Sequence, residues 1–220
     1  MGKSKYHVSD ISEIKIATQK KTLRSSQARS ERVQLLRAEY WAKAKNVDPK
    51  NLVFLDEMGV LLGLMRTHAR AAPGERAYNY KPFYRGSKVS VIGAITESKV
   101  LAVMTLNDSM DAAAFEVYVS KCLVPQLWKG AVVVMDNLPA HKVEAIAPLI
   151  EAVGAKILYL SPYSPEFNPI EHWWSQLKAF LRQFSPRTSK RVDMLIKIAM
   201  DLINPKHLRN WFAHCCYCPS

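Results

Sequence analysis

The sequence lacks the features that membrane, secreted and disulfide-bonded proteins need. No apolar run approaches the roughly 20 residues that span a bilayer, and the basic N-terminus has no hydrophobic stretch like that of a secretory signal. Only four cysteines occur in 220 residues, and three of them lie at the C-terminal end. A disulfide framework is therefore not expected. We expect a chain without membrane association that works in a reducing cytoplasm.

Acidic residues are also scarce, because 31 lysines and arginines stand against 19 aspartates and glutamates. The excess lies at the two ends of the chain. Residues 1–50 carry 12 basic and five acidic side chains, and residues 178–220 carry eight and two, whereas residues 51–177 are nearly neutral. A near-neutral middle between basic flanks indicates a polyanionic partner. A purely solubilising role of the flanks is the alternative.

Five strands are predicted in the middle of the chain. Residues 51–56 and 131–136 are continuous apolar runs that end in aspartate, and 156–160 is a third run, so each predicts a strand buried on both faces. Residues 88–95 and 100–106 predict two further strands joined by a short turn. The first three strands suit antiparallel pairing, and the later ones, joined by helices, suit parallel pairing. We therefore predict an α/β fold with one mixed five-stranded sheet and helices on both faces.

Helical periodicity predicts six helices, over residues 31–45, 111–127, 139–153, 168–184, 189–203 and 205–214. At the start of the fourth helix, Asn168 is expected as the N-cap and Pro169 at the first helical position. Trp173 and Trp174 are adjacent and cannot both face one direction. We therefore expect one of them in the core and the other outside it.

Three acidic residues occupy positions suited to a metal site. Asp56 and Asp136 each close a buried run, where a strand leaves its sheet and ligand-binding groups collect. If these strands are neighbours, the two carboxylates repel unless a proton or a cation lies between them, and Mg²⁺ with oxygen ligands suits such a pair. Glu171 starts a helix, and 34 residues separate it from Asp136. Ordinary strand-ending acids, and a capping box for Glu171, are the alternatives.

Three segments resemble the motifs of mariner-type bacterial insertion-sequence transposases: FLDEMG at 54–59, VVMDNLPAHK at 133–142 and YSPEFNPIEHWWSQLK at 163–178. The interval of 34 residues between the second and third acids is also typical of that group. These transposases are DDE superfamily endonucleases with a ribonuclease-H-like fold, and the resemblance implies the same fold here. It also implies that Asp56, Asp136 and Glu171 are catalytic and bind two Mg²⁺ ions, which Mn²⁺ could replace.

The resemblance further implies an activity, a substrate and a cell compartment. The activity is metal-dependent cleavage and strand transfer of double-stranded DNA, at transposon ends and at the target, by a homodimer assembled on DNA in the bacterial cytoplasm. A ribonuclease-H-like nuclease that hydrolyses without joining is one alternative. The other is a truncated, non-catalytic DNA-binding remnant that interferes with a full-length transposase.

We divide the chain into a basic N-terminal arm with a connecting helix (1–50), a catalytic domain (51–185) and a basic helical extension (186–220). Family members usually begin with a longer helix-turn-helix region, whereas some 50 residues precede the first motif here. A separate N-terminal DNA-binding chain is therefore a candidate partner.

Further polar residues are expected to assist the acids or to bind DNA. Asn137, His141 and Asn168 are expected in supporting roles. The basic residues expected to contact DNA phosphates are Lys20, Lys21, Arg24, Arg66, Arg70, Arg76, Arg85, Lys178, Arg182, Arg187, Lys190 and Arg191.

Overall fold

The computed structural model describes residues 26–66, 68–80, 88–137 and 144–218. Five strands form one sheet in the order β3-β2-β1-β4-β5: β1 (Leu52–Leu61), β2 (Lys88–Ile95), β3 (Val100–Leu106), β4 (Val132–Met135) and β5 (Lys156–Tyr159). The β1–β2 and β2–β3 pairs are antiparallel, and the β1–β4 and β4–β5 pairs are parallel. The predicted mixed sheet of five strands is therefore confirmed.

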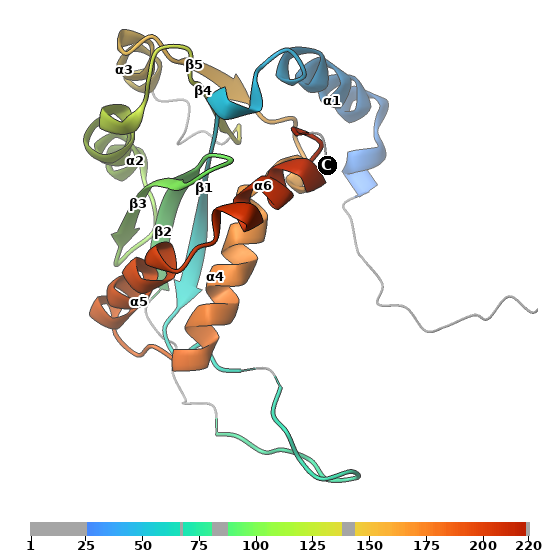
Figure 1. Cartoon of the computed structure of the whole chain (residues 1–220), viewed down its shortest axis with the longest axis vertical. Helices are drawn as coiled ribbons and strands as arrows, with labels where there is room; N and C mark the ends of the chain where they lie inside the picture. The colour runs from blue at the N-terminus through green and yellow to red at the C-terminus, as the bar shows by residue number, and fades with distance from the viewer. Residues whose placement is uncertain (1–25, 67, 81–87, 138–143, 219–220) are drawn as a thin grey trace, which may run out of the picture.

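Helices cover both faces of the sheet (Figure 1). One face carries α2 (Ala112–Tyr118), which continues as irregular helical turns to Gln126, and α3 (Ile146–Ala152). The other face carries α4 (Ile170–Phe184), α5 (Ser189–Asp201) and α6 (Pro205–His214), and α1 (Glu31–Ala44) contributes to the same core. No helix in the described part of the chain is both long and apolar enough to cross a bilayer.

The first half of β1 shows why the sheet needs both layers of helices. Successive side chains of a strand point to opposite faces. Leu52 and Phe54 accordingly pack into the core beneath α4, and Val53 and Leu55 into the core beneath α2 and α3. All four side chains are completely buried. The continuous apolar run is thus the sequence of a central strand covered on both sides.

The end of β1 differs from the prediction. The strand does not stop at Asp56 but runs on to Leu61, paired with β2. Beyond Asp56, Met58 and Val60 are buried while Gly59 and Leu61 are exposed. This alternation is typical of a strand with one exposed face. A prediction based on continuous apolar runs therefore ends the strand too early, at Asp56. Only the parallel pairing with β4 ends before Asp56, at Phe54.

Two other expectations about the later elements need correction. β5 is not buried on both faces: its two end residues are exposed and its two middle residues half-buried, because it is the edge strand of the sheet. In the described residues, the helix expected over 139–153 begins at Ile146, and residues 138–143 lie outside them. Gly154 follows α3 with a φ of +75°, a conformation that favours glycine, and it ends the helix as expected.

Candidate active site

A pocket of about 460 Å³ brings together the three acids singled out in the sequence. Asp56 comes from the middle of β1, Asp136 directly follows β4, and Glu171 lies in the first turn of α4. In the parallel register of β1 and β4, Phe54 pairs with Val134. Asp56 and Asp136 each lie two residues beyond this pair, so the two aspartates occupy equivalent positions on neighbouring strands.

Three N–H groups hold the Asp56 carboxylate. Its Oδ1 accepts from the backbone N–H of Glu57 at 2.8 Å. Its Oδ2 accepts from Asn168 Nδ2 at 3.3 Å and from Trp174 Nε1 at 3.2 Å. The donors come from β1, from the segment before α4 and from α4 itself, so the carboxylate is fixed by elements far apart in the sequence.

The ionised form of Asp56 is unfavourable despite these hydrogen bonds. Burial raises the pKa of its carboxyl group to about 7, and the nearby Glu171 and Asp136 carboxylates add to the rise. A cation between such carboxylates would offset their repulsion. Asn168 Oδ1 is also buried and has no hydrogen-bond partner among the described residues, although buried polar atoms normally have one. Carboxylate and amide oxygens are the donors that suit Mg²⁺ or Mn²⁺.

The three acids line the pocket but do not form a closed cage. Within the described residues, no three His, Cys, Asp or Glu side chains lie close enough together to enclose one ion. Each acid projects from its own element into a shared space lined also by Arg32 and Asn137.

The two tryptophans of α4 pack next to Asp56: Trp174 donates to its carboxylate, and Trp173 stacks on Trp174. Both Trp173 and Trp174 are almost completely buried, with stacked rings 4.5 Å apart. The expectation that one of them lies outside the core is therefore wrong. Gly93, which pairs with Asp56 across β1 and β2, makes room for both rings. A Cβ at Gly93 would lie 2.8 Å from an atom of each indole.

The start of α4 also differs from the prediction. The N-cap residue of α4 is Pro169, and no side chain caps the helix. The Asn168 N–H donates to Pro165 O at 3.0 Å, so the capping box considered for Glu171 is not formed. The Asn168 side chain instead turns toward Asp56, which offers a charge-assisted hydrogen bond in place of a backbone one. Glu171 is exposed to the pocket without a capping role.

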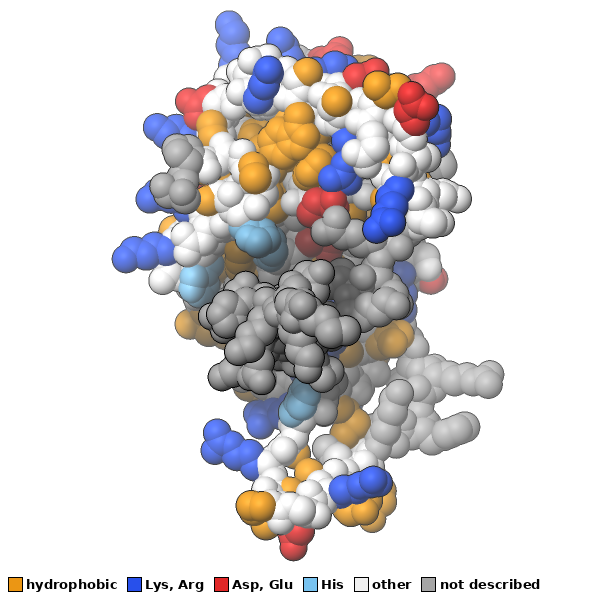
Figure 2. Space-filling model, turned by 90° about the vertical axis from the view of Figure 1, so that its right-hand side faces the viewer, with side chains coloured by type: hydrophobic (Ala, Val, Ile, Leu, Met, Phe, Trp, Pro, Cys, Tyr) orange, Lys and Arg blue, Asp and Glu red, His pale blue; other side chains and the backbone are white. Residues whose placement is uncertain are grey.

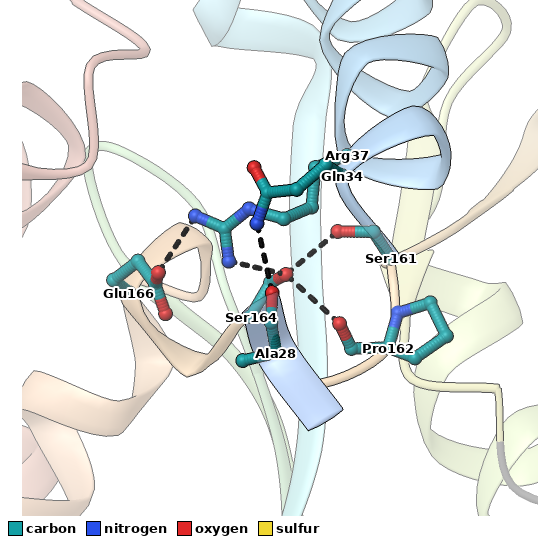
Figure 3. A network of polar contacts seen from close by, with 7 residues as sticks. All are labelled: Ala28, Gln34, Arg37, Ser161, Pro162, Ser164 and Glu166. Atoms are coloured by element: carbon teal, nitrogen blue, oxygen red, sulfur yellow. Dashed lines mark hydrogen bonds and ion pairs between the residues drawn. The ribbon is translucent and has the colours of Figure 1, made fainter. Parts of the chain in front are cut away.

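One wall of the pocket is held by residues that the sequence analysis missed. The segment 160–165 lines the pocket, and Arg37 of α1 binds this segment and the 3₁₀ turn after it (Pro165–Phe167) (Figure 3). Arg37 Nη1 donates to Ser164 Oγ at 3.0 Å, and Nη2 donates to Glu166 Oε1 at 2.7 Å. Its partners lie 127 and 129 residues away in the sequence, so no local pattern could have found them.

The predicted DNA-binding cations that belong to the described part of the chain lie outside the pocket. Arg66, Arg70 and Arg76 are exposed on the loop after β1, which projects away from the sheet (Figure 1). Lys178 and Arg182 are half-buried on α4.

Figure 2 shows acidic side chains near the middle of one face and lysines and arginines around it. The exposed cations near the start of α5 are Arg187, Lys190 and Arg191. The predicted residues that lie outside the described part of the chain are Lys20, Lys21, Arg24, Arg85 and His141.

A known family matches the part of the chain that carries the three acids. The profile of the family described as DDE superfamily endonuclease matches residues 51–195, which include all three acids. The chain belongs to this family. No curated protein sequence matches it.

Solved structures of Mos1 transposase resemble this DDE superfamily endonuclease in fold. The mariner Mos1 paired-end complex with Mg has a TM-score of 0.74 at 16% identity, over 91% of this chain and 64% of the Mos1 chain. The Mos1 strand transfer complex has a TM-score of 0.72 at 16% identity, over 92% and 64%. The Mos1 catalytic domain has a TM-score of 0.55 at 14% identity, over 83% and 84%. The predicted ribonuclease-H-like fold is thereby confirmed, and the chain spans less than two thirds of the Mos1 chains in the complexes.

Proposed function

We propose that this DDE superfamily endonuclease is the catalytic part of a transposase, which cleaves DNA at the ends of a mobile element and joins those ends to target DNA. The observation that carries the proposal is that Asp56, Asp136 and Glu171 line one pocket of a chain in this family. The Mos1 structures of similar fold, which include a paired-end complex and a strand transfer complex, support it.

Asp56, Asp136 and Glu171 would hold two Mg²⁺ ions, or Mn²⁺ in their place, and the orphan Oδ1 of Asn168 would support them. Mos1 complexes with Mg and with Mn are in line with this metal preference. When bound, the ions would activate a water or a 3′-hydroxyl and stabilise the leaving oxygen. The N–H groups of Asn168 and Trp174 would keep the Asp56 carboxylate in one orientation throughout.

The partners proposed for the chain follow from its charge and from the Mos1 complexes of similar fold. The basic residues predicted above to contact DNA, which lie in the 1–50 arm, the loop after β1, α4 and the 186–220 extension, would neutralise phosphates around the 51–185 catalytic domain. Arg32, which lines the pocket, joins the earlier candidates. We further propose a homodimer on DNA and a bacterial insertion sequence as the source.

The test is cleavage of a labelled duplex that carries the sequences flanking the gene, in Mg²⁺ or Mn²⁺. The wild type is compared with Glu171→Gln and with Glu116→Gln, which changes an exposed glutamate on α2, away from the pocket. We expect metal-dependent nicking and joined products from the wild type and Glu116→Gln, and neither from Glu171→Gln. Nicking without joining would indicate a hydrolytic nuclease, and binding without nicking would indicate a non-catalytic remnant.

A further inference from the structure

We propose that Arg37 is a positioning residue of the active site: from helix α1 it fixes the segment that carries Asn168 and Glu171 to the Asp56 carboxylate. The proposal deepens the function proposed above and rests on it. It makes α1 part of the catalytic unit, although the family match begins at residue 51.

The contacts of Arg37 are stronger than those of an ordinary surface ion pair. Its side chain is 19% exposed, and that of Glu166 is 33% exposed. The guanidinium binds Ser164 and Glu166 with two different N–H groups and also lies 4.4 Å from the centre of the Phe167 ring. An exposed ion pair contributes little because solvent screens it and both side chains stay mobile. The Arg37 guanidinium has lost that mobility, because it makes two hydrogen bonds and lies over an aromatic ring. It therefore holds Ser164, Glu166 and Phe167 together.

Ser164 transmits this restraint along the pocket wall (Figure 3). Its hydroxyl accepts from Arg37 and from Ser161 Oγ at 2.8 Å, and it donates to Pro162 O at 3.1 Å. Both serines are buried. Between them Tyr163 has a φ of +55°, a conformation that is unfavourable for a bulky residue and persists only where the surroundings impose it. The hydrogen bonds of Ser164 with Arg37, Ser161 and Pro162 hold Tyr163 in this conformation.

The turn held by Arg37 leads directly to the site residues. Phe167 immediately precedes Asn168, and its carbonyl oxygen accepts from Tyr217 Oη at 2.7 Å. The turn is therefore held on one side by α1 and on the other by the C-terminal segment after α6. Next along the chain, Asn168 donates to Asp56, and Glu171 enters the pocket three residues later. Loss of Arg37 would remove one of these two restraints on the turn and leave the sheet and its aspartates in place.

A role of Arg37 in direct DNA binding fits the structure less well. Its two terminal nitrogens already donate to protein acceptors, and its planar face lies on Phe167. A phosphate would have to displace Glu166 to reach the guanidinium. The change expected on removal of Arg37 is therefore loss of site geometry at nearly constant DNA affinity.

The experiment compares the wild type with Arg37→Gln, Ser164→Ala, Arg37→Lys and a matched control, Lys43→Gln, which removes an exposed cation from the same helix. Three quantities are measured on the full chain: hydrogen exchange of the 160–172 peptides without metal, Mn²⁺ affinity by electron paramagnetic resonance, and cleavage rate at saturating DNA. For Arg37→Gln and Ser164→Ala we expect faster exchange in 160–172 but not in β1. We also expect Mn²⁺ affinity and cleavage to fall about 10- to 100-fold, as for other residues that orient metal ligands.

Arg37→Lys should lose less than Arg37→Gln but more than wild type, because an ammonium group cannot reproduce the two hydrogen bonds of the planar guanidinium. Lys43→Gln should behave as wild type. Unchanged exchange in 160–172, or faster exchange with unchanged Mn²⁺ affinity, would overturn the positioning role. If Arg37→Gln does not fold, Ser164→Ala decides by the same criteria. Failure of the proposed function gives a different pattern, because the wild type itself would then neither bind Mn²⁺ nor cleave DNA.

Discussion

The two walls of the acid-lined pocket are built in different ways. The sheet wall consists of β1, β2 and the two tryptophans of α4, and its Asp56 receives three N–H donors above these stacked, buried rings. The loop wall is the segment 160–168, in which the described regular structure is one 3₁₀ turn. A single arginine from α1 and a tyrosine from the C-terminal segment hold that turn.

The difference separates two tasks of a metal-binding site. The sheet wall keeps a carboxylate in a desolvated place, where its charge is unfavourable until a cation arrives. The loop wall leads into the first turn of α4, where Glu171 is exposed to the pocket, and a few polar contacts hold this wall. Mutations in the sheet wall should therefore change stability, and mutations in the loop wall should change metal affinity at nearly constant stability.

Loss of Asp136, which lies between the two walls, should have the largest effect. Asp136→Asn should lower the cleavage rate by about a thousand-fold or more, because a lost metal ligand removes several kcal/mol of transition-state stabilisation. DNA retention should stay within about two-fold of wild type, since no phosphate contact is removed. Rates are measured by gel assay and retention by filter binding. Asp108→Asn, which changes an exposed acid outside the pocket, is the control, and a loss under ten-fold would remove Asp136 from the site.

Gly93→Ala should break the sheet wall. The new methyl group would lie 2.8 Å from both indoles, and overpacking of this kind costs about 1–3 kcal/mol of unfolding free energy. It should also weaken the Trp174 hydrogen bond to Asp56. Urea unfolding measures the change. Gly59→Ala in β1 is the matched control, because its methyl group would meet only the movable end of the Lys88 side chain. Equal stability of the two variants would contradict the account of Gly93.

The pH dependence of stability should distinguish the walls. The folded protein keeps a proton on Asp56 up to about pH 7, whereas the unfolded chain loses it near the ordinary value of 3.8. Between these values the native state binds more protons, so the unfolding free energy of the metal-free protein should fall as pH rises, by an amount on the order of a few kcal/mol.

Asp56→Asn should abolish this decline and leave the protein more stable than wild type at pH 8. Glu171→Gln, on the loop wall, should retain most of the decline. Urea unfolding from pH 4 to 8 checks both variants. A wild-type stability that rises over this range would show that Asp56 is not desolvated.

The smallest effect is expected outside both walls. Lys190→Gln should weaken DNA binding slightly and reduce the slope of log affinity against log salt by about one unit, as for one lost phosphate contact. Fluorescence anisotropy across a salt series measures the slope. Lys156→Gln, which changes an exposed lysine of β5, should leave it unchanged. Identical slopes for both variants would exclude Lys190 from the DNA surface.

The sheet wall was the more predictable of the two from sequence. The apolar runs ending in Asp56 and Asp136 indicated two buried strands, whose adjacency the sheet then supplies, and the 88–95 and 100–106 strands have the predicted bounds. The burial of Trp173 beside Trp174 could not be foreseen, because it depends on the missing side chain of Gly93, 80 residues earlier. Burial of one strand face is a local pattern, whereas space for a second large ring is set by tertiary structure.

The contacts that hold the loop wall could not be predicted from the sequence, although residues 163–178 form one of the three motifs. Arg37 lies in a segment that was predicted as a helix from its apolar residues, and that pattern says nothing about its cations. Glu166 lies in a stretch rich in proline and serine. Their ion pair has no periodicity, since it joins residues 129 positions apart. Asn168 was recognised as a residue of interest but assigned to the helix cap, because the nearby N–H groups of α4 are local and the Asp56 carboxylate is not.

The most direct test of the central claim is to soak crystals of the full chain in Mn²⁺ and to locate the ions by anomalous scattering. We expect Mn²⁺ in the pocket, bound by Asp56 on the sheet wall, Glu171 at the end of the loop wall and Asp136 between them. We also expect Glu171→Gln crystals to lose at least one ion. Mn²⁺ bound elsewhere on the chain, with this pocket empty at saturating concentration, would contradict the account.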